Sequence, residues 1–149
     1  RSFGSWQHNG ESMTAIFDSL MTGLPFLLLH SSVTFLMLGA GLLIYVRITP
    51  FDEISLIKNK NNAAAITLGG AIVGFAIPLA ASLKTSLNLW DIVIWGFVTL
   101  ILMLISYRVI DFLVRDLARR VEANEIGPAI LLAAIKLAVG LIAAASVAG

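Results

Sequence analysis

The chain contains no cysteine and little charge. Among its 149 residues there is no Cys, there are only two His, and charged residues make up 13%, against about 25% in a typical soluble domain. The lack of cysteine excludes disulfides, thiolate metal sites and cysteine nucleophiles. The two histidines, His8 and His30, have no Asp or Glu near them in the apolar runs, so no catalytic or metal cluster is indicated. We therefore expect no enzyme, no metal, no cofactor and no binding to nucleic acid.

What the chain has instead is apolar sequence. Apolar residues make up 58% of it, and the mean hydropathy is +0.93. Four runs are each close to the roughly 20 residues with which a helix crosses a ~30 Å hydrocarbon core. Backbone groups in lipid must be satisfied within the segment, which requires helices. The sequence predicts an all-α polytopic membrane protein with four transmembrane helices, over residues 25–46, 63–83, 89–107 and 127–147.

The basic residues are unevenly distributed along the chain. Most of them follow the first or the third apolar run: Arg47, Lys58, Lys60, Arg108, Arg115, Arg119 and Arg120. Connections rich in Lys and Arg remain in the cytoplasm. We expect both of these connections to be cytoplasmic, with the N- and C-termini on the periplasmic or outer side.

Residues 1–24 have the pattern of a helix that lies on the outer membrane surface. After a capping Ser12, apolar side chains recur with helical spacing on one face, and Gly23 and Pro25 are placed to end this helix and begin the first span. A disordered leader is the alternative. The apolar face comprises Met13, Ile16, Phe17, Leu20 and Met21.

The two cytoplasmic connections are amphipathic. In the first, Thr49 can cap a helix that has Pro50 at its first position and two acidic residues in its first turn. In the second, Leu113, Leu117 and Val121 form a stripe, and Asp111–Arg115 and Asp116–Arg120 are spaced as ion pairs. We interpret both as juxtamembrane surface helices; a platform for a partner or for anionic lipid is the alternative. Their charges are Arg47, Asp52, Glu53, Arg108, Arg115, Asp116, Arg119 and Arg120.

The second half of the chain resembles the first. An offset of about 64 positions aligns residues 65–68 with 129–132, residues 80–82 with 144–146, and Asp52 with Asp116. Two spans per unit give both copies the same orientation. We expect a tandem parallel two-helix repeat, with units at 25–83 and 84–149 after the interfacial segment at 1–24.

The second and fourth spans are rich in small residues. Small side chains let helix backbones approach closely in lipid, so these faces are candidates for a packing core or an oligomer interface. They comprise Gly69, Gly70, Gly74, Ala76, Ala80, Ala133, Gly140 and Ala144. Pro78 should kink the second span.

Lys136 interrupts the fourth span near its middle, where a lysine is costly. Its counterpart in the repeat is Ile72, and no carboxylate is expected at the same depth. One interpretation is a lysine that snorkels or rests against backbone carbonyls. The other is a midplane ion site, which could also include His30, or pairing with an acidic group of another subunit or a lipid.

Two stretches resemble a known family. They are Arg47 to Glu53 (RITPFDE) and Leu68 to Ala71 (LGGA), and the match continues through residues 116–120 and 128–134. Together they resemble the YjfL-like family of small bacterial inner-membrane proteins, a domain of unknown function, over roughly residues 25–149. The resemblance implies a four-span inner-membrane protein with a duplicated unit and supplies no catalytic residues.

Two functions fit these observations. The first is a structural or accessory membrane protein that self-associates, or docks onto a larger complex, through its small-residue helix faces. The second is a small oligomeric ion channel or transporter that uses Lys136. Membrane lipids are partners in both cases.

Overall fold

The computed structural model describes residues 5–85 and 88–149, and these form six α-helices. Four of the helices are long and apolar enough to cross a membrane, as the hydropathy predicts. The helices are α1 (Ser5–Ile48), α2 (Glu53–Lys58), α3 (Asn62–Thr85), α4 (Leu89–Leu113), α5 (Leu117–Glu122) and α6 (Ile126–Ala148).

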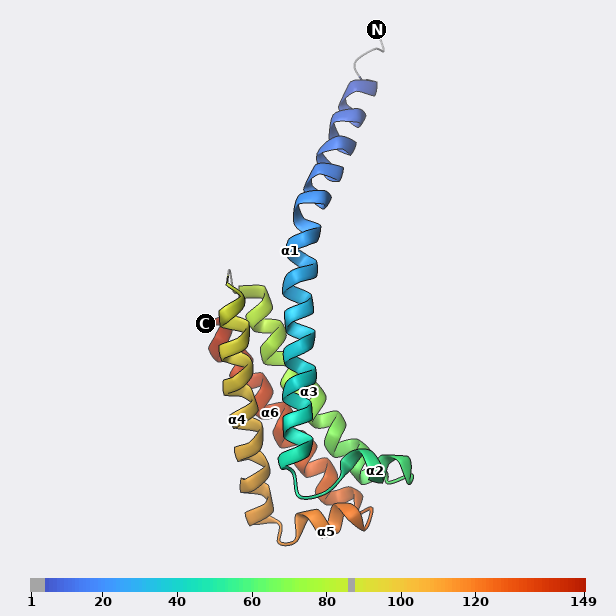
Figure 1. Ribbon diagram of the computed structural model, residues 1–149, viewed down its shortest axis with the longest axis vertical. Coiled ribbons are helices and arrows are strands. Elements are labelled where there is room, and N and C mark those ends of the chain that lie inside the picture. Colours follow the sequence, from blue (N-terminus) through green and yellow to red (C-terminus); the bar gives the residue numbers. More distant parts are fainter. Residues whose placement is uncertain (1–4, 86–87) are drawn as a thin grey trace.

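The long helices alternate in direction (Figure 1). α1 and α4 run toward the end of the bundle that carries the short helices, and α3 and α6 run back from it. We call this end the α2–α5 end. α3 is central: it packs most extensively on α6 and also contacts α1 and α4.

The four spans satisfy most of their hydroxyl groups within the same helix. Ser32, Thr34, Thr99, Ser106 and Ser146 each donate to the carbonyl oxygen four residues earlier, over 2.6–2.9 Å. Such bonds remove unpaired donors from an apolar environment. The hydroxyl groups of these five residues are therefore hydrogen-bonded within the span, whether the side chain faces lipid or the core.

α1 differs from the expectation for the N-terminal segment. It is continuous from Ser5 to Ile48 with Pro25 inside it, so the helix end predicted at Gly23 is wrong. At 1.5 Å per residue its 44 residues span about 66 Å, nearly twice the roughly 36 Å of the 24-residue α3. Residues 1–4 of the predicted interfacial segment lie outside the described part of the chain.

The first half of α1 projects beyond the bundle (Figure 1). All side chains from residue 12 to residue 29 are exposed, and the first buried one is His30. We call residues 12–29 the α1 arm. Its exposed apolar side chains are Met13, Ile16, Phe17, Leu20, Met21, Leu24, Phe26, Leu27, Leu28 and Leu29.

Helix bounds recur with the spacing of the predicted repeat. α2 begins at Glu53 and α5 at Leu117, 64 positions later, and their last residues differ by the same number. α3 and α6 also begin 64 positions apart. A left-handed backbone precedes each of these two spans, at Lys60 (φ 63°) and Asn124 (φ 61°).

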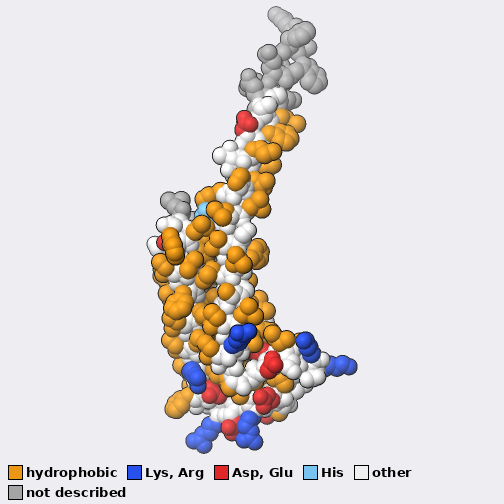
Figure 2. All heavy atoms as spheres, viewed as in Figure 1, with side chains coloured by type: hydrophobic (Ala, Val, Ile, Leu, Met, Phe, Trp, Pro, Cys, Tyr) orange, Lys and Arg blue, Asp and Glu red, His pale blue; other side chains and the backbone are white. Residues whose placement is uncertain are grey.

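Charged and apolar surfaces are separated along the bundle. Figure 2 shows Lys, Arg, Asp and Glu gathered at the α2–α5 end, with apolar side chains covering the visible face between this end and the arm. α2 and α5 lie across this charged end and close the bundle there (Figure 1).

Candidate functional site

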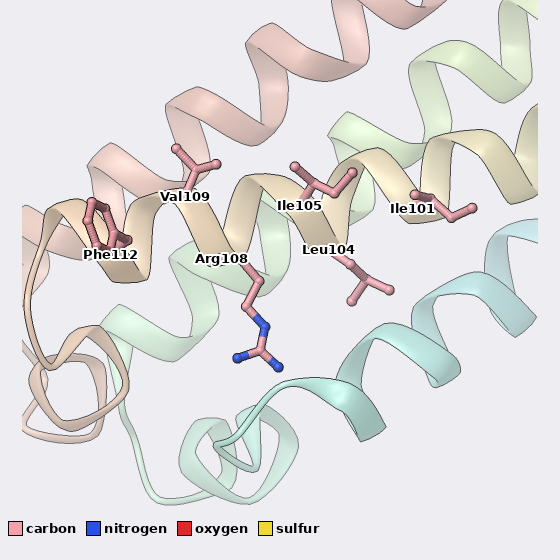
Figure 3. A pocket seen from close by; sticks show the side chains of 6 residues that line it. All are labelled: Ile101, Leu104, Ile105, Arg108, Val109 and Phe112. Carbon is pink, nitrogen blue, oxygen red and sulfur yellow. The ribbon is translucent and has the colours of Figure 1, made fainter.

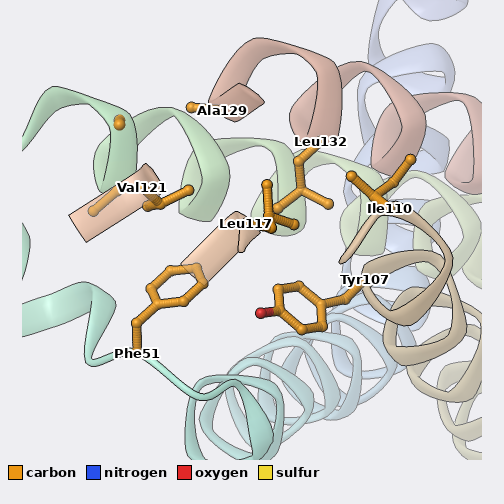
Figure 4. Packing of buried hydrophobic residues seen from close by; sticks show 9 residues of the cluster. Phe51, Tyr107, Ile110, Leu117, Val121, Ala129 and Leu132 are labelled. Atoms are coloured by element: carbon orange, nitrogen blue, oxygen red, sulfur yellow. The ribbon is translucent and has the colours of Figure 1, made fainter. Parts of the chain in front are cut away.

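The small helices α2 and α5 cover a buried core at their end of the bundle. Figure 4 shows Phe51 and Tyr107 side by side, with ring centroids 6.2 Å apart, below side chains from α4, α5 and α6. Leu117 and Val121 of α5 are fully buried. The predicted stripe is thus interrupted: Leu113 ends α4 with 69% exposure, and only its two partners on α5 point inward.

Asparagine side chains fix the two connections to each other. The Asn61 Nδ2 group donates to the carbonyl oxygens of Val121 (2.9 Å) and Glu122 (3.1 Å), and its Oδ1 accepts from the Ala64 amide (2.9 Å). The Asn124 Oδ1 accepts from the Ala63 amide over 3.0 Å. These bonds pair amides at the start of α3, which have no partner within the helix, and carbonyls at the end of α5, of which Val121 also accepts from the Asn124 amide over 2.9 Å.

Lys136 is fully buried inside the bundle. Its Nζ donates to the Thr67 carbonyl oxygen over 3.1 Å and lies 4.5 Å from the centroid of the Tyr45 ring. Side chains on a helix lean toward its N-terminus, which for α6 is the α2–α5 end. The lysine side chain therefore extends toward the α2–α5 end inside the bundle, where its ammonium group meets a carbonyl and an aromatic face and not water.

A carboxylate belongs to the same cluster. Glu53, the first residue of α2, is fully buried. Its Oε1 accepts from the Thr67 hydroxyl over 3.3 Å, a proton that Thr67 also offers to the Ala64 carbonyl at 2.9 Å. Thr67 thus links the two ionisable residues, offering its hydroxyl to Glu53 and its carbonyl to Lys136.

Burial sets the protonation of Glu53. Loss of water raises the pKa of its carboxyl above the ordinary 4.5, while the Lys136 charge and the Thr67 hydrogen bond oppose that rise. The second carboxyl oxygen, Oε2, has no hydrogen-bond partner among the described residues. The same holds for the hydroxyl groups of Tyr45 and Tyr107.

We call Tyr45, Glu53, Thr67, Tyr107 and Lys136 the buried polar cluster. The sequence identified Lys136 as a candidate site residue. It placed Glu53 on a surface helix, and this prediction was wrong because Glu53 is buried. A signal was available: the repeat aligns Asp52 with Asp116, so Glu53 aligns with Leu117, a core residue. The first turn of α2 also differs from the expectation, because Asp52 and not Thr49 caps it, its Oδ1 accepting from the Ser55 amide over 3.2 Å.

The other predicted juxtamembrane charges are not buried. Arg120 is held by Glu125 over 2.7 Å and not by Asp116; within the described residues this is the one ion pair. Asp111 and Arg115 likewise form no pair. The exposed members are Arg47, Asp52, Arg108, Arg115, Asp116 and Arg119.

The small residues meet between α3 and α6. A Cβ added at Gly70 would lie 2.6 Å from the Ala133 Cα, and one at Gly74 would lie 2.6 Å from the Lys136 carbonyl oxygen. A Cβ at Gly140 would overlap the Gly74 carbonyl oxygen. These positions allow the two backbones to touch, whereas Gly69 faces open space and Ala80 is exposed. Ala76 and Ala144 are half-buried.

His30 does not join Lys136. It precedes Tyr45 by 15 positions on α1, about 22 Å at 1.5 Å per residue. Its Nδ1 lies 3.0 Å from the Phe26 carbonyl oxygen, and its ring stacks on Phe26 with centroids 3.8 Å apart. The two residues therefore do not form one ion site within this chain.

The cluster can hold charge but is not built to hold a metal. In the described ranges 5–85 and 88–149, no three His, Asp or Glu side chains are grouped closely enough to hold a metal ion. Its groups are one acid, one amine and three hydroxyls, which suit proton and hydrogen-bond exchange.

A four-span helical bundle closed at one end by two short helices, with ionisable groups buried beneath them, defines a multi-pass membrane protein. The chain belongs to the DUF350 family, a Domain of Unknown Function, which matches residues 19–147. It is 29% identical over 104 residues to the UPF0719 inner membrane protein YjfL of Escherichia coli K12, covering 70% of this chain and 79% of that protein. The same values hold for YjfL of Escherichia coli O157:H7. No solved structure matches the chain.

Proposed function

We propose that this chain is a structural or accessory protein of the bacterial inner membrane that associates with further copies of itself through the α1 arm. The proposal includes no catalytic chemistry. The inner-membrane location is carried over from the relatives named YjfL. Assembly with a larger complex would use the same arm.

The observation that carries the proposal is the exposure of the arm. Eighteen consecutive residues leave the bundle, about 27 Å of helix, and ten of them are large and apolar. Where it lies outside the bilayer, contiguous exposed apolar surface of this extent marks a site for a protein partner or for the membrane surface, and the proposal takes the partner to be another copy of this chain. Ile16, Phe17 and Leu20 recur at helical spacing, so two arms side by side would bury each other's stripes.

The small-residue faces support an internal role better than an intermolecular one. Gly70, Gly74 and Gly140 lie in the contact between α3 and α6 of one chain, which leaves little of that surface for another copy. The proposal therefore moves the docking surface from the second and fourth spans to α1.

We further infer a duplicated two-span unit with its α2–α5 end in the cytoplasm. The 64-position agreement of helix bounds supports the duplication. The basic residues of both connections support the orientation, since they gather at one end. The arm then begins on the periplasmic side.

A cysteine scan tests the arm, because the natural chain has no cysteine to interfere. We would introduce Ile16→Cys, Phe17→Cys and Leu20→Cys one at a time, with Asp18→Cys and Thr22→Cys on the opposite face. Oxidation in native membranes should give dimers from the first group and few from the second.

Trp90→Cys provides the control for random collision. Trp90 is 69% exposed at the start of α4 and is not part of the arm. Equal dimer yields at arm positions and at Trp90 would refute association through the arm. Cross-links from the arm to other polypeptides, without homodimers, would make the protein an accessory subunit.

The buried polar cluster supports transport as a second candidate. Ionisable residues inside membrane bundles commonly mark proton or ion pathways. Beyond the cluster, however, Phe75, Leu79 and Met103 are buried and pack together in the core, and the hollow beside Tyr45 has a volume of only about 10 Å³. That is about the space of a single water, so this hollow is too small to form part of a continuous aqueous path.

A further inference from the structure

Two hollows meet on the exposed surface of α4 near its C-terminal end, at the border between apolar and charged surface. One, of about 420 Å³, runs along the last turns of α4, and the other, of about 640 Å³, lies between α4, α5 and the bend at Pro50. Arg108 and Phe112 line both. The two hollows therefore form one groove that is apolar at one end and charged at the other.

The apolar part follows the helix toward the middle of the bundle. Figure 3 shows its side chains spaced along one stretch of α4, with Arg108 extending sideways from the helix toward the segment at the end of α1. Ile105 and Val109 are 52% and 49% exposed, and the lining contains almost no polar surface. Such a groove can accept a hydrocarbon chain, and its lining has almost no polar surface that would bind a free ion.

The charged part contains three arginines and two aspartates, a net charge of +1. Arg108, Arg115 and Arg119 are exposed and make no hydrogen bond or ion pair with any described residue. Their guanidinium groups are available to an outside anion, and guanidinium pairs well with phosphate oxygens. Asp111 and Asp116 leave acceptor oxygens beside them.

We propose that this groove binds one anionic phospholipid with a hydroxyl-bearing headgroup. Arg108, at the junction, meets the phosphodiester, and Arg115 and Arg119 contribute further donors. The net +1 of the pocket matches the single negative charge of a phosphodiester. The aspartates accept from headgroup hydroxyls, and one acyl chain lies along Ile105 and Val109.

The order of the parts favours a lipid over a soluble phosphate. A membrane lipid has its phosphate at the level where a span ends and its acyl chains beside the span. Arg108 lies five residues before the end of α4, at Leu113, and the apolar hollow extends from it into the span. A soluble phosphate would use the arginines alone and leave the apolar hollow without a role.

Native mass spectrometry of the full chain in mild detergent tests the proposal. We would add phosphatidylglycerol, phosphatidylcholine of the same chain length, or soluble glycerol 3-phosphate. We expect one phosphatidylglycerol per chain, bound at least tenfold more tightly than phosphatidylcholine. Arg108→Gln should weaken phosphatidylglycerol binding about tenfold, by loss of a charge-assisted hydrogen bond.

Lys58→Gln is the matched control, since Lys58 is an exposed cation at the same end but lines neither hollow. An equal loss from Lys58→Gln would mean general attraction to basic surface and would overturn the site. Equal binding of phosphatidylcholine would also overturn it.

A second variant tests the acyl groove. Ile105→Trp should reduce phosphatidylglycerol binding without affecting glycerol 3-phosphate, and circular dichroism checks that both variants stay folded. Glycerol 3-phosphate that binds as tightly as the lipid would replace the proposal with a soluble phosphate site.

Discussion

A single methyl group at Gly74 tests how closely α3 and α6 pack. A Cβ there would lie 2.6 Å from the Lys136 carbonyl oxygen, while ordinary contact begins at 3.4 Å, so the helices must separate by about 0.8 Å. The obstacle is backbone and cannot rotate away. Overpacking of this kind costs about 1–3 kcal/mol.

Gly69→Ala provides a matched control on the same helix. Nothing lies within 4 Å of a Cβ at Gly69, so this variant should have unchanged or slightly greater stability, by up to about 1 kcal/mol, from the lower backbone entropy of alanine in the unfolded chain. The entropic stabilisation by alanine is the same in Gly74→Ala and in Gly69→Ala. The difference between them, about 1–3 kcal/mol, therefore isolates the clash.

Unfolding of the purified protein by increasing SDS in mild detergent, followed by tryptophan fluorescence, gives the two free energies of unfolding. We expect Gly74→Ala to unfold at lower SDS than the natural chain and Gly69→Ala not to. Equal stability of the two variants would mean that α3 and α6 are not in backbone contact, and the assignment of the packing face would fail.

Two further predictions concern the buried polar cluster. Because the pKa of Glu53 is raised on folding, the folded state keeps its proton where the unfolded chain has lost it, so stability should be greatest below pH 4.5 and fall as pH rises through the folded pKa. Glu53→Gln should remove this part of the pH dependence, and the exposed Glu122→Gln should retain it; parallel profiles for all three proteins would contradict the burial of Glu53. In liposomes, the structural proposal predicts no ion flux above that of empty vesicles, for the natural chain and for Lys136→Met alike. A selective flux that Lys136→Met abolishes would replace the structural proposal with transport.

The four spans could be predicted because membrane insertion depends on local composition. Each run is long and apolar enough to cross the core. The many Gly and Ala residues of the second and fourth spans are also a local property of the sequence. They indicated close packing, because small side chains let helix backbones approach each other. The bounds of α3 agree with the prediction to within two residues, because its apolar run ends at polar residues on both sides.

The N-terminal helix shows where local signals are insufficient. Gly23 and Pro25 are typical of a helix end, yet α1 passes through both. Proline removes one donor, and the carbonyl it leaves unpaired lies on the exposed arm. Whether such a site breaks a helix depends on what surrounds it.

Burial of Glu53 was decided only by the tertiary structure. By sequence it is one of an acidic pair in a charged connection, and a solvated position is the default for that pattern. Folding carries α2 over the end of the bundle, so that Asp52 faces water while Glu53 meets Thr67 and approaches Lys136, from helices distant in sequence. The sequence by itself determined which segments enter the membrane, through hydropathy within one segment. Which charges share a buried cluster was decided by packing between segments, because burial is a property of neighbours that composition does not contain.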